Sequence, residues 1–329
     1  MILAGDIGGT KTNLAAFEVG TRSLKLVVKE SYHSREHATL EEIVAQFLAQ
    51  HALKIDHACF GIAGPVREGR VEATNLAWVV ESQVLAQEIG ITVVQLINDL
   101  EATAHGIATQ ASADLIVLNA GAPKASGNVA VIAAGTGLGE AGAYWDGKRL
   151  HPFACEGGHS DFAARSPLDA ELFVYLHRKF GHVAWERVLS GPGLVNVYEF
   201  LRDSGRGQET PELTAKLHAE DPAAVISQAA LAKSCQLCVD AVELFVSLYG
   251  AEAGNLALKV MATGGVYIGG GIAPHLIERL QAGVFIEAFV AKGRMEPLMR
   301  SMPVRVLMNP ETALWGAAYA AASEAGLLN

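Results

Sequence analysis

Two glycine-rich segments of the chain have the composition of loops that contact phosphate. Residues 5–13 read GDIGGTKTN and residues 134–140 read AGTGLGE, and each segment follows an apolar run and leads into another run typical of a strand. Because glycine has no side chain to hold an anion away, main-chain N–H groups at such turns can contact phosphate oxygens directly. The residues that we expect to bind the phosphates of a nucleotide are Gly8, Gly9, Thr10, Lys11, Gly135, Thr136 and Gly137. The two segments predict a polyphosphate held from two sides, and therefore a nucleotide-dependent transferase.

Two aspartates follow apolar runs that predict strands. Asp6 stands at the end of the first run, where a carboxylate could hold Mg²⁺ through water. Asn98 and Asp99 close a later run and precede a predicted helix that starts near Leu100, which puts a carboxylate at the carboxyl end of a strand. Transfer of a phosphoryl group to an alcohol needs a group that accepts the hydroxyl proton. Position alone makes Asp99 equally a helix cap or that base, and the phosphate loops favour the base.

A third polar segment is EGGH at residues 156–159, which begins with Glu156 and ends with His159. A carboxylate and an imidazole on either side of two glycines can hydrogen-bond a polyhydroxylated substrate. The alternatives are a structural turn and a metal site, but zinc prefers three or four closely spaced ligands and fewer are present locally. Glu186, judged by its own surroundings, is a surface helix residue. Gly270, in a run of three glycines after a short predicted strand, is a further candidate contact for the nucleotide.

Two better-known phosphate motifs are matched only in part. Residues 142–149 fit the P-loop pattern G-x-x-x-x-G-K-[ST] until the last position, where Arg149 replaces the hydroxyl that would hold Mg²⁺. Residues 137–142 satisfy the dinucleotide pattern G-x-G-x-x-G, but that motif needs a helix immediately afterwards, and residues 141–147 are typical of a strand and turn. We interpret both matches as accidental.

These segments fall at the ends of predicted strands in two similar runs of elements. The strands predicted in the first run are 2–7, 14–19, 24–31, 57–62 and 92–97, and those in the second run are 115–118, 129–133 and 141–145. Thr39 with Glu42 predicts a capping box at the start of a helix, and Ser82 is expected to cap a shorter helix. The repetition predicts a duplicated α/β architecture.

The rest of the chain is expected to be largely helical. The pattern is helical through most of residues 169–259, and it is followed by short strands at 266–268 and 304–308 and by a final helix at 311–325. We predict two domains that meet along a cleft, with crossings near residues 110 and 311. The domains are a small α/β domain of residues 1–110 plus 312–329 and a large α/β domain of residues 111–311.

The composition limits the class of protein and its partners. The chain has 329 residues, half of them apolar, so it can bury a large core. Its net charge of -10, without any basic run, argues against a nucleic-acid partner. No apolar stretch has the length of a membrane span and no signal-peptide pattern is visible, so we expect a cytoplasmic protein with no membrane partner. Cys235 and Cys238 lie in a long helical pattern, which favours helix cysteines over a metal or redox site.

Seven motifs taken together closely resemble the bacterial glucokinase family. They are GDIGGT at 5–10, GIAGP at 61–65, TNLAW at 74–78, IND at 97–99, GTGLG at 135–139, EGGH at 156–159 and ERVLSGPG at 186–193. The resemblance spans nearly the whole chain, and the number, order and spacing of the motifs make the joint match specific. The chain lacks the cysteine-rich zinc motif of the repressor-related sugar kinases, so it resembles the zinc-free branch.

The resemblance implies a fold, an activity and roles for particular residues. The fold is α/β, with two domains of actin-like (ribonuclease H-like) type, each with a mixed sheet flanked by helices. The activity is transfer of the γ-phosphoryl group of ATP to the 6-hydroxyl of D-glucose with Mg²⁺, by a cytoplasmic homodimer. Asp99 is then the general base, and the sugar-binding positions are Asn98, Asp99, Glu156, His159 and Glu186. A non-catalytic sugar sensor, a kinase for an acid or polyol, and a donor other than ATP remain open alternatives.

Overall fold

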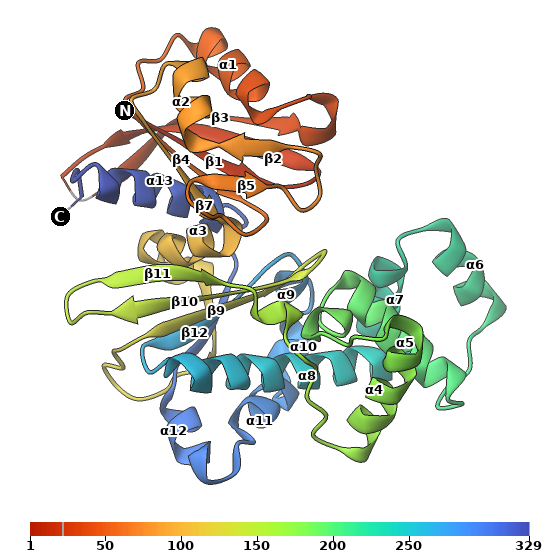
Figure 1. The fold of residues 1–329 in the computed structure, drawn as a ribbon. Helices are drawn as coiled ribbons and strands as arrows, with labels where there is room; N and C mark the ends of the chain where they lie inside the picture. The colour runs from red at the N-terminus through yellow and green to blue at the C-terminus, as the bar shows by residue number, and fades with distance from the viewer. Residues whose placement is uncertain (22, 329) are drawn as a thin grey trace. The chain divides into compact units, whose positions relative to one another are not determined.

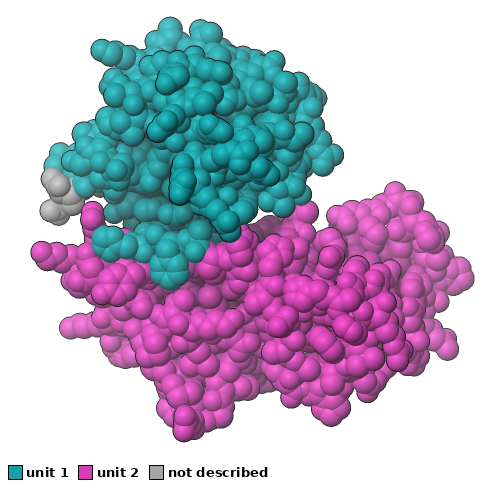
Figure 2. All heavy atoms as spheres, viewed as in Figure 1, with its two compact units in different colours: residues 1–114, 151–154, 309–329 teal, residues 115–150, 155–308 magenta. Residues whose placement is uncertain are grey.

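The computed structural model describes residues 1–21 and 23–328. The chain divides into two compact units, which Figure 2 colours separately. Unit 1 consists of Met1–Asp114, His151–Ala154 and Asn309–Asn329, and unit 2 consists of Leu115–Leu150 and Cys155–Met308. The predicted α/β class is confirmed, since the structure contains two mixed β-sheets flanked by helices (Figure 1).

A five-stranded sheet forms the centre of unit 1. Its strands are β1 (Ile2–Ile7), β2 (Lys11–Val19), β3 (Leu24–His33), β4 (His57–Ile62) and β7 (Val93–Asn98), in the order β3-β2-β1-β4-β7. β1 and β2 form an antiparallel hairpin, whereas β1, β4 and β7 run parallel. Ile7 pairs with Ile62, and Ile62 pairs with Asn98, so the carboxyl ends of three strands line up at one edge of the sheet. This edge receives the turn after Ile7 and the start of the helix after Asn98.

Helices cover both faces of the unit 1 sheet. Leu3 packs into the core that α1 (Leu40–His51) covers, and its neighbour Ile2 packs into the core that α13 (Thr312–Glu324) covers. Because successive side chains of a strand point to opposite faces, β1 needs apolar residues at nearly every position. α13 also packs against α3 (Asp99–Gly106), the helix that follows β7.

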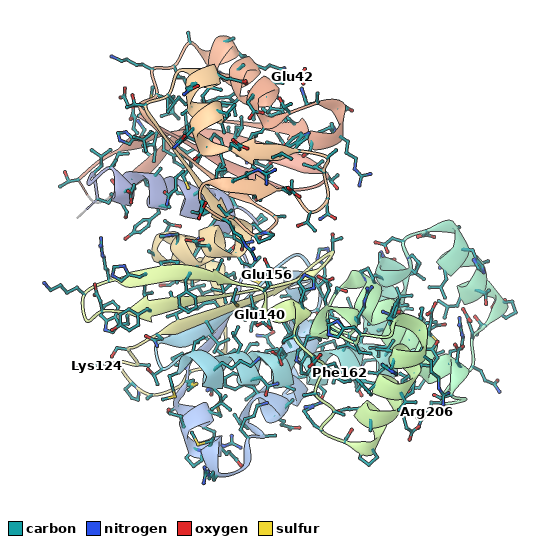
Figure 3. All side chains as sticks on the ribbon, viewed as in Figure 1. Glu42, Lys124, Glu140, Glu156, Phe162 and Arg206 are labelled. Atoms are coloured by element: carbon teal, nitrogen blue, oxygen red, sulfur yellow. The ribbon has the colours of Figure 1, made fainter. Side chains whose placement is uncertain are left out.

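Of the two N-caps predicted in unit 1 at Thr39 and Ser82, one is confirmed and one is wrong. Thr39 caps α1 as predicted, because its Oγ1 accepts the Glu42 N–H at 3.3 Å. The Glu42 carboxylate (labelled in Figure 3) accepts the N–H of Ala38, the residue before the cap, at 3.0 Å. The prediction for Ser82 is wrong: α2 (Ser82–Ile89) begins at Ser82 itself, and Glu81 before it makes no side-chain cap. Glu81 ends β6 (Val79–Glu81), which pairs with β5 (Arg70–Glu72).

The sheet of unit 2 repeats the arrangement of the first. Its strands are β8 (Leu115–Asn119), β9 (Val129–Ala134), β10 (Leu138–Trp145), β11 (Leu150–Cys155), β12 (Gly265–Gly269) and β13 (Val304–Leu307), in the order β11-β10-β9-β12-β13-β8. β9 and β10 form an antiparallel hairpin in which Ala134 pairs with Leu138, and β9, β12 and β13 run parallel. The same succession of hairpin and parallel strands in both sheets confirms the duplicated architecture.

A long helix, α8 (Gln236–Val260), packs against β9 and β12 (Figure 1). The ring of its Tyr249 meets Phe285 of α11 (Val284–Val290) edge to face, with 5.6 Å between centroids. The other helices of unit 2 are α4 (Pro167–Phe180), α5 (Gly191–Asp203), α6 (Pro211–Ala219), α7 (Pro222–Leu231), α9 (Ile272–His275), α10 (Ile277–Gln281) and α12 (Glu296–Ser301). Among the described residues, no helix combines the length and apolar character needed to cross a membrane.

Two features of unit 2 differ from the sequence predictions. β11 was not predicted, and it contains Pro152. Proline removes an N–H from the hydrogen-bond ladder, which an edge strand tolerates, and β11 is at the edge of its sheet. The helical pattern after Pro222 is broken at Cys235, which precedes the first residue of α8. Cys235 is therefore the residue before α8, Cys238 lies in the first turn of that helix, and both are free thiols.

Candidate active site

The first glycine turn closes the hairpin of β1 and β2. The N–H of Gly8 donates to the carbonyl of Lys11 at 2.9 Å, and the Ser34 hydroxyl donates to the carbonyl of Gly8 at 2.7 Å. A Cβ added to Gly9 would lie 2.5 Å from the Cβ of Asn75, so only glycine fits there. Thr10 and Lys11 are exposed. The turn is thus fixed from two sides while its outer residues stay accessible to a ligand.

Asp6 and Asp99 lie close enough in unit 1 for their charges to interact. Asp6 comes just before the end of β1, and the Asn13 amide donates to its carboxylate at 3.4 Å. Burial raises the pKa of Asp6 to about 6; the Asn13 hydrogen bond acts in the opposite direction, and the charge of Asp99 adds to the rise. Asp6 thus places a buried carboxylate beside the glycine turn.

Asn98 and Asp99 divide two tasks at the start of α3. The side-chain oxygen of Asn98, Oδ1, accepts the Leu100 N–H at 2.9 Å, and the side-chain amide nitrogen donates to the main-chain carbonyl of Gly64 at 3.1 Å. Asp99 Oδ1 lies 3.0 Å from the same Leu100 N–H. Asn98 is the N-cap of the helix. The capping role that the sequence left open for Asp99 is therefore filled by Asn98. Asp99 is the first residue of α3 and is half-buried.

The second glycine turn closes the hairpin of β9 and β10. The Gly135 N–H donates to the Gly137 carbonyl at 2.9 Å, and the Gly191 N–H donates to the Gly135 carbonyl at 2.8 Å. Gly191 is the first residue of α5, which Ser190 caps through the Gly193 N–H at 2.9 Å. The turn is therefore tied to a helix start, and the side chain of Thr136 is exposed.

Glu186 lies against this second turn. It belongs to a short 3₁₀ turn, Trp185–Arg187, and its carboxylate accepts the Leu138 N–H at 3.0 Å. A Cβ added to Gly137 would overlap the same carboxylate oxygen. The interpretation of Glu186 as a surface helix residue is therefore wrong. Nothing near Glu186 in the sequence indicates this contact, because Leu138 is far away along the chain.

Glu156 and His159 face each other across a 3₁₀ turn, Gly157–His159. Nε2 of His159 lies 3.9 Å from Oε2 of Glu156, and both side chains are more than half exposed. A Cβ added to Gly158 would overlap the carbonyl of Leu138. Leu138 thus contacts this turn through its carbonyl and Glu186 through its N–H. Unit 2 brings together Glu156, His159, Glu186 and the turn 135–137.

Gly270 follows β12 in a conformation that favours glycine, with φ of +80°. A Cβ there would overlap the carbonyl of Ala134, the last residue of β9. The hydroxyl of Tyr249 accepts the Ala134 N–H at 3.1 Å and lies 3.4 Å from the Gly269 carbonyl. This fully buried tyrosine of α8 therefore holds the ends of β9 and β12, a role that no sequence motif indicates.

The candidate residues form two sets, one on each unit. Unit 1 carries Asp6, Asn98, Asp99 and the turn 8–10, and unit 2 carries the turn 135–137, Glu156, His159, Glu186 and Gly270. Within residues 1–21 and 23–328, no three His, Cys, Asp or Glu side chains gather as a group that could hold a metal ion. Each unit therefore offers main-chain amides at a glycine turn together with carboxylates suited to hydrogen bonding.

Known proteins share this sequence and architecture. Residues 3–324 match the family described as Glucokinase. A glucokinase of Nostoc punctiforme is 41% identical, in an alignment that covers 98% of this chain and 99% of the relative. The solved glucokinase from an Antarctic psychrotroph has a TM-score of 0.84 and 31% identity, with 98% of each chain covered.

A more distant likeness extends to the repressor-related (ROK) sugar kinases. The solved ROK family glucokinase of Streptomyces griseus, in complex with glucose and AMPPNP, has a TM-score of 0.65 at 21% identity, and covers 98% of this chain and 99% of its own. At this identity the likeness concerns the fold, which is the actin-like two-domain fold of sugar kinases. Together with the family match over nearly the full length, these relationships show that the chain belongs to the glucokinase family.

Proposed function

We propose that the protein transfers the γ-phosphoryl group of ATP to the 6-hydroxyl of D-glucose, giving glucose 6-phosphate and ADP. The observation that carries this proposal is the junction at Leu138. Its N–H binds the carboxylate of Glu186, its carbonyl lies under the turn that bears Glu156 and His159, and it directly follows the glycine turn 135–137. A candidate phosphate loop and three candidate sugar ligands thus meet at Leu138, the first residue of β10.

Glucose is neutral and strongly hydrated, so its site has to replace each hydrogen bond to water. Asn98, Asp99, Glu156, His159 and Glu186 offer carboxylates, an amide and an imidazole for this purpose. A hydroxyl left unpaired in the buried site costs about 1 to 3 kcal/mol, which is the basis for rejecting epimers. We therefore expect selectivity for glucose over galactose.

Asp99 is the proposed catalytic base. At the carboxyl end of β7 it can accept the proton of the sugar's 6-hydroxyl as that oxygen attacks the γ-phosphorus and the bond to ADP breaks. Asn98 holds the start of α3 through the Leu100 N–H, which fixes the backbone that carries Asp99. Main-chain amides of the turns at 8–10 and 135–137, with Gly270, would contact the phosphates, and the exposed Lys11 is placed to add a positive charge.

The residues present fit a magnesium ion held through water. Mg²⁺ prefers oxygen ligands and keeps several of its waters, so a carboxylate such as Asp6 next to a phosphate loop is sufficient. Asn13 orients that carboxylate. When bound, Mg²⁺ would neutralise charge on the β- and γ-phosphates. Asp6 would therefore hold the ion through water, with its carboxylate oriented by the Asn13 amide.

The setting of the enzyme is also a proposal. The family resemblance supports a homodimer that acts at the start of glycolysis, and the need for ATP supports the cytoplasm as its location. The four cysteines are free, as expected where thiols stay reduced. Light scattering during size-exclusion chromatography tests the oligomeric state, since a monomer across the working concentrations would contradict the homodimer.

The activity is tested by measuring ADP release with a panel of acceptors and donors under one condition. We expect turnover with glucose and ATP, at least tenfold lower kcat/KM with galactose, and none with acetate, because each mispaired hydroxyl costs about 1 to 3 kcal/mol. Binding of glucose without ADP release would support a non-catalytic sensor instead. Faster turnover of a polyol or acid, or with polyphosphate, would contradict the proposed acceptor or donor.

Gly137→Ala is expected to raise the KM for glucose by about tenfold, because the added methyl group must displace the Glu186 carboxylate that it overlaps. Gly135→Ala is the matched variant, since no atom lies within 4 Å of its added Cβ. It should fold normally and raise the KM for ATP, because its methyl group enters the space proposed for a phosphate. Initial rates with each substrate varied separate the two effects. The same pattern of KM changes in both variants would contradict these assignments.

A further inference from the structure

Two buried glutamates lie beneath the turn that carries Glu156 and His159. Glu140 of β10 is 1% exposed and Glu252 of α8 is 0% exposed. Neither carboxylate oxygen of Glu140 receives a hydrogen bond from an N–H or hydroxyl of the described residues, yet its carboxyl lies within hydrogen-bonding reach of Glu252. Two carboxylates can be joined in this way only if one of them carries a proton.

The surroundings decide which of the two is protonated. The Asn255 amide donates to Glu252 Oε2 at 2.7 Å, and Lys259 Nζ lies 3.5 Å from Glu252 Oε1. Lys292 adds positive charge near Glu252, and its ammonium is held by the Asn255 side chain at 2.6 Å. Glu252 therefore has the partners of an ionised carboxylate, and Glu140 is the member that keeps the proton.

The direction of the pKa shift agrees with this division. Burial raises the pKa of Glu140, and the negative charge of Glu252 raises it further, while Lys259 opposes the shift only in part. Burial also raises the pKa of Glu252, but there the Asn255 and Lys259 hydrogen bonds act against the rise. These opposing effects favour Glu140 over Glu252 as the carboxyl that holds a proton at neutral pH.

Glu140 is in direct contact with the turn. A Cβ added to Gly157 would overlap Oε2 of Glu140, so the main chain of the turn lies on the Glu140 carboxyl. Glu140 lies on β10, and Glu156 lies at the start of this turn; both are labelled in Figure 3, where they are near each other. Glycine is needed at both positions after Glu156, because a Cβ at 157 would collide with the Glu140 carboxyl and a Cβ at 158 would collide with the Leu138 carbonyl.

We propose that Glu140 is a positioning residue of the sugar site, whose protonated carboxyl, hydrogen-bonded to Glu252, supports the turn that presents Glu156 and His159. This inference rests on the proposed function, because it assigns the turn to glucose. Loss of the proton would leave two buried negative charges side by side and a third, Glu156, close above them. The turn would then be displaced, and glucose would bind more weakly while the chemical step in the bound complex stayed the same.

This arrangement predicts a KM for glucose that depends on pH. The groups facing Glu140 are Glu252 and Lys259 of α8, Tyr249 one turn earlier on the same helix, and Cys155 before the turn. Burial of Lys292 lowers its pKa to about 8, so the cationic side of the cluster also titrates in the alkaline range. A variant at Glu140 is needed to separate its proton from that of Lys292.

The test compares the full-length wild type with Glu140→Gln, whose amide keeps the shape and the hydrogen bond to Glu252 without an ionisable proton. In the wild type we expect the KM for glucose to rise about tenfold between about pH 7 and about pH 9.5, with kcat changed less than twofold. In Glu140→Gln the KM should stay near the neutral-pH value across this range. Glu243→Gln, at an exposed site on α8, should titrate as the wild type does. The same pH profile in wild type and Glu140→Gln would overturn the inference.

Two further measurements do not depend on turnover. Infrared spectroscopy of the wild type at pH 7 should show a protonated carboxylic acid that is lost in Glu140→Gln, and its absence from the wild type would overturn the inference even if the variant failed to fold. The raised folded pKa means that the stabilisation from Glu140 is complete below its unfolded pKa and is lost as pH rises through the folded pKa. The melting temperature of the wild type should therefore fall relative to that of Glu140→Gln from about pH 4.5 to about pH 8. A wild type without glucose turnover would contradict the proposed function alone.

Discussion

Asp99→Asn is expected to lower kcat for glucose phosphorylation by about 10²- to 10⁴-fold, which is the usual contribution of a general base. The amide has nearly the shape of the carboxylate and can still accept the Leu100 N–H, so the start of α3 should stay intact. It cannot accept the proton of the 6-hydroxyl at neutral pH. A coupled assay at saturating glucose and ATP measures kcat, and calorimetric titration with ATP should give an affinity within about threefold of the wild type.

The control for this experiment is Asp56→Asn, an exposed aspartate of unit 1 outside the candidate site. Its kcat should equal that of the wild type, which excludes a general effect of removing one negative charge. Near-normal turnover in Asp99→Asn would remove Asp99 from the mechanism. Loss of ATP binding together with turnover would show that Asp99 acts in binding and not as the base.

Gly270→Ala is expected to lower the free energy of unfolding by about 2 to 5 kcal/mol, from a left-handed backbone and an overpacked contact. The added methyl group overlaps main-chain atoms of Ala134. Those atoms cannot move aside easily, because the Ala134 N–H is bonded to the buried Tyr249 hydroxyl. Since Ala134 precedes the turn 135–137, the KM for ATP should also rise by at least tenfold. Urea unfolding and initial rates with ATP varied measure the two effects.

Gly271→Ala provides the comparison. Gly271 is the next residue, its φ is negative, and no atom lies within 4 Å of an added Cβ. Its free energy of unfolding should stay within about 1 kcal/mol of the wild type. Equal loss of stability in both variants would mean that the whole glycine run needs flexibility, and the specific contact with Ala134 would then not be the cause.

Local chemistry explains why much of the fold could be predicted from the sequence. The hairpin turns at 8–10 and 135–137 follow apolar runs and contain the glycines that tight turns need, so their position between strands was evident. The α/β class and its duplication followed from the order of these runs. Asn98 and Asp99 could be placed at a strand end for the same reason. The exact start of α2 could not be predicted, because the helix begins one residue earlier than a Ser82 cap requires, and Glu81 before it makes no side-chain cap.

The contacts that build the site come from residues distant in the sequence. Glu186 reaches Leu138, and Glu140 meets both Glu252 and Gly157, through pairings that only the folded sheet and α8 create. No periodicity or spacing encodes such contacts. Glu140 was also concealed by its place in a partial dinucleotide motif. β11 was not predicted because proline usually interrupts a strand. Pro152 is tolerated in β11 only because the strand lies at the edge of its sheet.

Tyr249 and Glu252 are one turn apart on α8, and they serve different loops. The tyrosine holds the strand ends that bear the candidate phosphate loops, whereas the glutamate supports the acid under the candidate sugar turn. The single helix α8 therefore supports both candidate binding regions of unit 2. A ligand that shifts α8 when it binds at one loop changes the free energy of ligand binding at the other loop. Thermodynamic reciprocity requires this coupling free energy to be equal in both directions.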